Sequence, residues 1–269
     1  MHKLSLGFSP CPNDTHVFYA LVHGIVKATG IALSHQIHDV ETLNNMALNE
    51  SLDVTKVSFY AYAHVTDKYA MLKTGGAMGR SCGPIIVSKK RMSPDELKGK
   101  KIAVPGKLTI AYLLTQLFEP AINNNSVLVM PFNEIMAAVR DGVVDAGVII
   151  HESRFTYHTF GLTEVVDLGA WWEKETALPI PLGCIIAKKS LGEGIISEIE
   201  HLILASVRYA NIHPAETRTY IKSHAAEMDD TVISEHIRLY VNNYTENTGD
   251  DGIAAFNKII NLAQDRGLL

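Results

Sequence analysis

The sequence predicts an α/β fold with two lobes and a ligand cleft between them. Strand-like apolar runs alternate with helical segments as far as about residue 190, a pattern typical of α/β layers with mostly parallel strands. A strand–turn–helix pattern that begins at residue 4 begins again at residue 101, which favours two similar lobes over one sheet. The segments GPIIVSK (83–89) and GCIIAKK (183–189) are alike, and we expect them to form a two-stranded hinge.

This hinge divides the chain. We expect residues 1–88 and 184–269 to form one lobe, which includes the C-terminal helices, and residues 89–183 to form the other. A cleft of this kind binds its ligand outside the carboxyl ends of the strands.

The spacing of apolar residues and the helix-capping residues predict the strands and helices of the first lobe. The two prolines of SPCPND interrupt regular structure after the first strand, so Asn13 or Asp14 is expected to cap the helix that follows. The predicted elements are strands at 4–8, 31–37 and 54–59, and helices at 15–23, 40–48 (capped by Asp39) and 60–72.

The second lobe repeats this alternation. Ser93-Pro94-Asp95-Glu96 is a capping box that begins a short helix. Further elements are expected as strands at 84–88, 101–104, 126–130 and 145–150, helices at 109–118 and 133–140, and, after residue 193, helices at 195–207, 214–226, 230–243 and 250–265.

Composition excludes several classes of protein. The 269 residues are 47% hydrophobic and 20% charged, which is typical of a globular chain. The 24 basic and 29 acidic residues give a net charge of −5 without a Lys/Arg block, so we expect no nucleic-acid partner. No uncharged apolar stretch approaches the ~18 residues of a spanning helix. The N-terminus lacks the apolar core of a signal peptide, so we expect a cytoplasmic protein.

Polar side chains follow or occupy the predicted strands where a ligand would lie. Lys56 and Ser58 share one face of an otherwise apolar strand, because residues two apart in a strand point the same way. Thr109 begins a helix whose first N–H groups, including that of Ile110, are donors for a carboxylate or phosphate. His151 follows a buried strand, and an ordinary histidine pKa of about 6.5 suits a general base. A solvated face for Lys56 and simple helix capping for Thr109 remain open alternatives.

Other kinds of site have weaker signals. No G-x-G-x-x-G, P-loop or G-x-S-x-G motif is present, so the sequence does not indicate nucleotide binding or a serine nucleophile. His35 and His38 lack further ligands nearby, so no metal site is expected. The three cysteines Cys11, Cys82 and Cys184 lack metal-ligand spacing and are expected as reduced thiols, with Cys11 kept as an alternative nucleophile.

Several motifs together carry a resemblance to one family. They are GFSPCPNDTHVFYALVHG (7–24), DVETLNN (39–45), TKVSFYAYAHV (55–65), AVPGKLTIAYLL (103–114), IIHESRFTY (149–157) and VVDLGAWWEKETALPIPLG (165–183). The chain resembles the 1,4-dihydroxy-6-naphthoate synthases of the futalosine route to menaquinone. The match covers nearly the whole chain and is weakest in the C-terminal helices.

The resemblance implies a fold, a reaction and a site. The fold is similar to the two-lobed type II periplasmic-binding-protein fold, and the enzyme is a cytoplasmic carbon–carbon lyase with no known cofactor. It converts cyclic dehypoxanthinylfutalosine, a carboxylated small molecule, to 1,4-dihydroxy-6-naphthoate. By motif, His151 is the proton acceptor, and the substrate-binding residues are Lys56, Val57, Ser58, Thr109 and Ile110.

Two other functions remain open at the level of the sequence. One is the chorismate dehydratase of the same pathway, and the other is a carboxylate-binding protein without catalytic activity. The sequence also leaves open the oligomeric state, the group that reprotonates the leaving fragment, and whether Asn44, Arg80 or Arg154 contacts the substrate.

Overall fold

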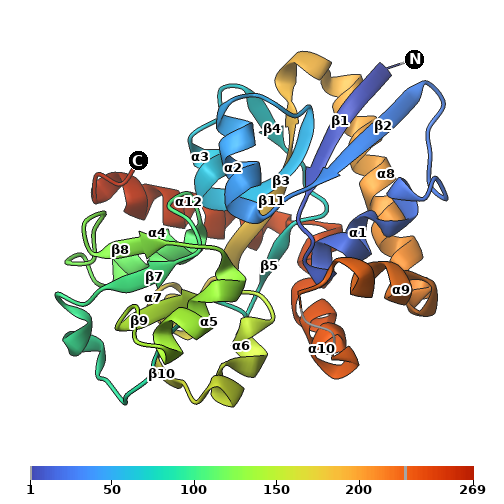
Figure 1. Ribbon diagram of the computed structural model, residues 1–269. Coiled ribbons are helices and arrows are strands. Elements are labelled where there is room, and N and C mark those ends of the chain that lie inside the picture. The colour runs from blue at the N-terminus through green and yellow to red at the C-terminus, as the bar shows by residue number, and fades with distance from the viewer. Residues whose placement is uncertain (1, 227–228) are drawn as a thin grey trace.

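The computed structural model describes residues 2–226 and 229–269 and confirms the α/β fold class, with two mixed sheets (Figure 1). The first sheet has the order β2–β1–β3–β11–β4, and β5 also pairs with β11. β1 is parallel to β2 and β3, whereas β11 is antiparallel to β3, β4 and β5. These strands are β1 (His2–Phe8), β2 (Ile31–Ile37), β3 (Val54–Ser58), β4 (Tyr69–Met71), β5 (Ala77–Gly79) and β11 (Ile180–Lys188).

The second sheet has the order β10–β6–β9–β7–β8. β7 is parallel to β8 and β9, and β6 is antiparallel to β9 and β10. Each sheet therefore combines three parallel strands with antiparallel ones, so the expectation of mostly parallel strands holds only for part of each sheet. The strands are β6 (Ile85–Ser88), β7 (Ile102–Val104), β8 (Val127–Val129), β9 (Ala146–Ile149) and β10 (Thr163–Asp167).

Helices cover both sheets, and Figure 1 shows the C-terminal helices α9 and α10 beside α1. The α-helices are α1 (Pro12–Val22), α2 (Val40–Leu48), α3 (Phe59–Ala63), α4 (Ile110–Phe118), α5 (Phe132–Arg140), α6 (Ser153–Thr156), α7 (Leu168–Thr176), α8 (Glu193–Ile212), α9 (Pro214–His224), α10 (Asp230–Tyr240), α11 (Asn243–Glu246) and α12 (Gly249–Asp265). Three short 3-10 helices are η1 (Pro94–Leu97), η2 (Tyr157–Phe160) and η3 (Lys189–Leu191).

Local sequence signals explain several boundaries. The Asp39 carboxylate accepts hydrogen bonds from the first N–H groups of α2, as predicted. Ser93 and Glu96 form the expected capping box of η1. Thr109 caps α4 by accepting a hydrogen bond from the Tyr112 N–H. The apolar stripe of α8 packs against the first sheet, with Ile199 and other core residues completely buried.

The first helix starts earlier than the sequence predicted. α1 begins at Pro12, and Cys11, not Asn13 or Asp14, occupies the N-cap position. Proline is compatible with the first turn of a helix, because the N–H groups of that turn have no acceptor within the helix and the lack of one costs no hydrogen bond. Asn13 and Asp14 consequently lie within the first turn, where both side chains are buried.

The prediction of one helix at 60–72 was wrong, and β5 was not predicted. α3 ends at Ala63, and the chain returns to the first sheet as β4, whose residues pair with β11. Both β4 and β5 have three residues each, which is too short for a hydrophobic period to appear in the sequence.

The two similar segments form strands, but these strands do not pair with each other. β6 lies between β9 and β10 in the second sheet, whereas β11 lies in the first, where β5 pairs with residues near its start. Residues 85–88 therefore belong to the second sheet and residues 180–183 to the first. The division of the chain into two lobes stays a prediction.

Candidate active site

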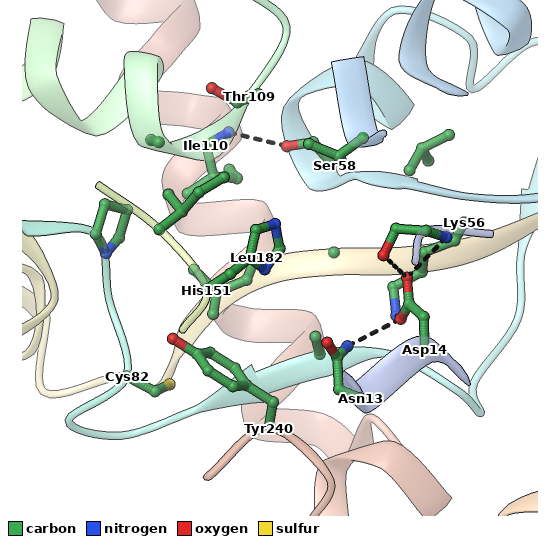
Figure 2. Close-up of a pocket in the computed structure, with 18 of the residues that line it drawn as sticks. Asn13, Asp14, Lys56, Ser58, Cys82, Thr109, Ile110, His151, Leu182 and Tyr240 are labelled. Carbon is green, nitrogen blue, oxygen red and sulfur yellow. Dashed lines mark hydrogen bonds and ion pairs between the residues drawn. The ribbon is translucent and has the colours of Figure 1, made fainter. Parts of the chain in front are cut away.

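A pocket, whose roughly 670 Å³ of empty space includes open solvent, is lined by strands of the first sheet and by segments that border strands of the second (Figure 2). The structure brings all six predicted site residues to it: Lys56, Val57, Ser58, Thr109, Ile110 and His151. The pocket also includes Asn13 and Asp14 from α1, Leu182 and Gly183 from β11, and Tyr240 from α10. Figure 2 shows His151 and Tyr240 on one side of the pocket and the Lys56–Asp14 pair on the other.

The backbone of His151 has an unusual conformation. The residue lies two positions after the end of β9 and has φ of 56°, in the left-handed region that residues with a side chain rarely adopt. Its ring meets the edge of the Phe132 ring, with centroids 5.0 Å apart, and lies 6.1 Å from the His236 ring at an interplanar angle of 28°. A conformation of this kind costs free energy, and such positions cluster at functional sites.

Burial lowers the pKa of His151 from its ordinary value of 6.5 to about 4. The nearby Lys56 ammonium lowers this pKa further, and the Asp14 carboxylate opposes the shift in part. The imidazole is therefore neutral near pH 7, with one ring nitrogen free of a proton and able to accept one.

Lys56 and Asp14 form an ion pair in the wall of the pocket. Lys56 Nζ lies 2.7 Å from Asp14 Oδ1, and the exposed fractions of the two side chains are 6% and 4%. Lys56 also donates a hydrogen bond of 3.0 Å to the Gly75 carbonyl. The Ser9 hydroxyl donates to the other carboxylate oxygen of Asp14, at 2.7 Å. Two of the three ammonium hydrogens of Lys56 are thus used within the protein.

A line of hydrogen bonds extends from this pair toward His236 on α10. Asn13 Nδ2 donates to Asp14 Oδ1 at 2.9 Å, so the amide oxygen of Asn13 faces His236 Nε2, also at 2.9 Å. Because an amide oxygen only accepts, Nε2 of His236 carries a hydrogen. The other ring nitrogen of His236 lies 3.7 Å from a carboxylate oxygen of Glu152. The pKa of His236 is lowered by burial and by the proximity of His151.

The beginning of α4 lies against β3. The Ile110 N–H donates to the Ser58 hydroxyl at 2.9 Å, and the Thr109 hydroxyl donates to the Gly106 carbonyl at 2.7 Å. Among the described residues, neither the Ala111 N–H nor the Ser58 hydroxyl hydrogen has an acceptor. These two groups are the donors left for an anionic ligand at the positive end of the helix.

Two side chains of α2 connect the first sheet to the loop before α4. Asn44 accepts a hydrogen bond of 2.9 Å from the Ser58 N–H and donates one of 3.3 Å to the Leu108 carbonyl. Both carboxylate oxygens of Glu41 lie 3.2 Å from the Leu108 N–H, and burial raises the pKa of this carboxyl. Asn44 therefore positions Ser58, although it is not part of the pocket lining.

The side chains of Arg154 and Arg80 do not line the pocket, although one partner of Arg154, Gly83, does. Arg154 donates to the Gly83 carbonyl at 2.7 Å and to the Asp167 carboxylate at 2.5 Å. Arg80 is exposed and donates to the Ala177 carbonyl. Neither arginine is part of the pocket lining, and Arg154 instead joins the loop before β6 to the end of β10.

The cysteines are buried free thiols, and burial raises the pKa of Cys11 well above its ordinary value. This disfavours the alternative of Cys11 as a nucleophile, because the thiolate is the reactive form. The described residues contain no cluster of three or more side chains suited to a metal ion. Within the same part of the chain, no helix is long and apolar enough to cross a membrane.

The chain is similar to known proteins over nearly its whole length. A family model described as menaquinone biosynthesis matches residues 4–265. The chain belongs to this family. A relative from Thermus thermophilus is 46% identical over 100% of this chain and 96% of its own length, and one from Streptomyces coelicolor is 45% identical over 99% and 94%. Both are named 1,4-dihydroxy-6-naphthoate synthase, which confirms the resemblance found in the motifs.

Solved structures show the fold of this menaquinone biosynthesis family member. Protein AF1704 from Archaeoglobus fulgidus has a TM-score of 0.94 at 36% identity, over 100% of this chain and 99% of its own. The alkanesulfonate-binding protein SsuA from Xanthomonas axonopodis has a TM-score of 0.75 at 14% identity, over 99% and 94%. A Candida albicans protein with the generic periplasmic-binding-protein fold has a TM-score of 0.71 at 14% identity, over 100% and 91%. The periplasmic-binding-protein-like fold is thus confirmed.

Sequence reasoning missed part of the pocket of this menaquinone biosynthesis family member. Residues 82–84 and Leu182 lie in or beside the two similar segments, so the likeness of those segments was a usable signal. Tyr240 gave no such signal, because it ends an amphipathic helix whose pattern is explained by packing alone. His236, one turn earlier in that helix, was missed for the same reason.

Proposed function

We propose that this chain is a 1,4-dihydroxy-6-naphthoate synthase, a carbon–carbon lyase that acts on cyclic dehypoxanthinylfutalosine in the cytoplasm. The observation that carries the proposal is a neutral His151, held in a left-handed conformation in the pocket, opposite the beginning of α4. The names of the two relatives support this function over chorismate dehydration and over ligand binding alone.

His151 acts as the general base in this proposal. Formation of the aromatic diol requires that one proton be removed and one carbon–carbon bond be broken. A base whose pKa lies below neutrality is always in its accepting form at pH 7, and general-base catalysis contributes typically ~10²–10⁴-fold. The left-handed backbone at position 151 fixes the ring beside Phe132 and His236, so the base is oriented before the substrate binds.

The carboxylate of the substrate binds at the beginning of α4. The Ser58 hydroxyl and the Ala111 N–H are its donors, and the third hydrogen of the Lys56 ammonium is directed to the same anion. Asp14 neutralises most of the charge of Lys56, so we assign the larger share of carboxylate binding to Ser58 and α4. Thr109 and Ile110 contribute the helix terminus and an apolar wall, and Val57 is a further lining residue of the pocket.

One incubation tests the proposed function. Purified protein is mixed with cyclic dehypoxanthinylfutalosine, and formation of 1,4-dihydroxy-6-naphthoate is followed by absorbance and mass spectrometry. Turnover is expected for the unmodified chain and not for a parallel sample with chorismate. Recovery of the intact substrate would contradict the proposal, and conversion of chorismate with loss of water would support the dehydratase instead.

A further inference from the structure

The loop between β7 and α4, residues 105–109, is tied to α2 through Glu41. Both carboxylate oxygens of Glu41 lie 3.2 Å from the Leu108 N–H, and one of them also accepts a hydrogen bond of 3.2 Å from Asn44 Nδ2. The same Asn44 nitrogen donates to the Leu108 carbonyl. Because β7 belongs to the second sheet and α2 packs beside β3 of the first, these contacts join the two sheets at one place.

The Glu41 side chain also packs closely against Gly106 of this loop. A Cβ atom added at Gly106 would lie 2.6 Å from Glu41 Cγ and closer still to Cδ and Oε2. Gly106 is buried and is not among the glycines with a positive φ, so glycine is required there by the lack of space and not by the backbone conformation. Any side chain at position 106 would therefore displace the Glu41 carboxyl group.

The same loop sets the position of the beginning of α4. The Thr109 hydroxyl donates to the Gly106 carbonyl, and the Ile110 N–H donates to the Ser58 hydroxyl (Figure 2). Asn44 fixes Ser58 independently, because its amide oxygen accepts a hydrogen bond of 2.9 Å from the Ser58 N–H. The two groups to which we assign the substrate carboxylate, Ser58 and the beginning of α4, are thus both held from α2.

We propose that Glu41 is a positioning residue for substrate binding, whose carboxyl group holds residues 106–108 against α2 and so keeps the Ala111 N–H and the Ser58 hydroxyl directed at one anion. Glu41 is not part of the pocket lining, so it acts on the substrate only through this loop. The inference rests on the proposed function, which places the substrate carboxylate at α4. A loop without this contact is in the binding arrangement for a smaller fraction of the time, and the apparent affinity falls by that fraction.

The first test is the variant Glu41→Ala. Its KM for cyclic dehypoxanthinylfutalosine is expected to rise about tenfold, which corresponds to a binding-competent fraction of about one tenth. Its kcat should stay within about threefold, because the bound carboxylate restores the arrangement of the loop before His151 reacts. A KM within twofold of the unmodified value, or a fall in kcat as large as the rise in KM, would overturn the proposal.

The variant Gly106→Ala tests the same contact from the loop. The new methyl group meets the flexible side chain of Glu41 and displaces its carboxyl group without removing it. KM should rise about as much as in Glu41→Ala. The double variant Glu41→Ala/Gly106→Ala should have the KM of Glu41→Ala alone, because the shorter side chain leaves room for the methyl group. If the two effects multiply instead, the loop and Glu41 act independently, which contradicts the proposal.

A matched control is available in Asp53→Ala. Asp53 directly precedes β3, is half-buried like Glu41, and accepts a hydrogen bond of 2.9 Å from the Ser5 N–H. It is not part of the pocket lining, and its partners Ser5 and Lys188 lie on β1 and β11 of the first sheet. This variant should lower the thermal midpoint and leave KM within twofold. Equal increases of KM in Asp53→Ala and Glu41→Ala would overturn the role of Glu41, because lost stability alone would then explain both.

The role of Glu41 and the proposed function fail in different ways. Failure of the proposed function would leave the unmodified chain without turnover of the cyclic substrate. Failure of the role of Glu41 would leave turnover in both proteins, with the same KM in the unmodified chain and in Glu41→Ala.

Discussion

The Nζ atom of Lys56 lies 2.7 Å from Oδ1 of Asp14, and both side chains are almost completely buried. The lysine that the sequence indicated as a substrate-binding residue is therefore already paired with a carboxylate of the protein. An ion pair at this depth adds little net stability, but the loss of one partner leaves an uncompensated charge in a poorly solvated place.

The variant Asp14→Ala is expected to lower the free energy of unfolding by about 3–5 kcal/mol, because Lys56 is then a buried cation without its anion. Urea unfolding measures this change. The double variant Asp14→Ala/Lys56→Met should be less destabilised than Asp14→Ala alone, because the charge is removed together with its partner. Simple additivity of the two single changes would show that the pair is not coupled.

The variant His151→Asn should fold with a normal circular dichroism spectrum and lose at least ~100-fold in turnover, because it lacks the base. Asparagine is the suitable replacement, since it tolerates the left-handed backbone at position 151 better than most residues. His158→Asn, at an exposed position outside the pocket, is the control and should keep its activity. Turnover by His151→Asn close to that of the control would remove the base role.

The pH dependence of kcat/KM should show an acidic limb near pH 4 and no limb near 6.5, since the neutral form of His151 is the active one and its pKa is about 4. Below that value the rate should fall about tenfold per pH unit. Rates are measured from pH 3.5 to 8, wherever circular dichroism shows folded protein. An acidic limb near 6.5 that disappears in His151→Asn would contradict the lowered pKa.

Stability should depend on the same group. The unfolded chain binds a proton at this histidine below about pH 6.5, and the folded chain only below about 4. The unfolded state therefore holds more protons between these values, so the unmodified protein loses stability as the pH falls through this window. His151→Asn should lose less stability over the same pH window, as measured by urea unfolding. Equal losses of stability in the two proteins would show that other groups dominate the pH dependence.

The variant Ser58→Ala should raise KM by about tenfold, the value of one charge-assisted hydrogen bond, with a smaller effect on kcat. The reason is that the Ser58 hydroxyl is proposed to bind the substrate carboxylate, which does not react. Steady-state kinetics with the cyclic substrate separates the two constants. Lys56→Ala should also raise KM, and an unchanged KM in both variants would place the carboxylate elsewhere.

The variant Gly83→Ala should destabilise the protein by about 1–3 kcal/mol or more, because the new methyl group has no room. A Cβ atom at this position would lie 2.2 Å from the Gly169 Cα, which is backbone and cannot rotate away. Gly194→Ala is the control, because no atom lies within 4 Å of its added Cβ and the residue is helical. The control should be neutral or stabilising, and equal thermal midpoints for both variants would contradict this contact.

Most regular elements were predictable because their signals are local. The strand at 31–37 and the helix at 40–48 have the predicted bounds, since alternation of side chains and an aspartate cap are properties of short stretches of chain. The start of α1 was misplaced because proline both breaks helices and begins them, and only the surrounding packing decides between these roles.

The candidate site was predictable where a residue follows a strand. His151 and the beginning of α4 were placed by that rule, and Ser58 by its place on one face of a strand. All of them line the pocket. Whether they perform the predicted roles is for the variants above to test. The Asp14–Lys56 pair and the ring of Tyr240 were not predictable in the same way, because each depends on a contact between segments far apart in the chain.

The sequence by itself determined the alternation of strands and helices, the caps, and the membership of a family, because these properties reside in the order of the side chains. The tertiary structure alone decided which strands pair, that the lysine at position 56 is neutralised from within the protein, and that a helix near the C-terminus supplies a phenol to the pocket. The physical reason is that pairing, burial and proton affinity depend on neighbours in space, and the distance along a chain does not fix those neighbours.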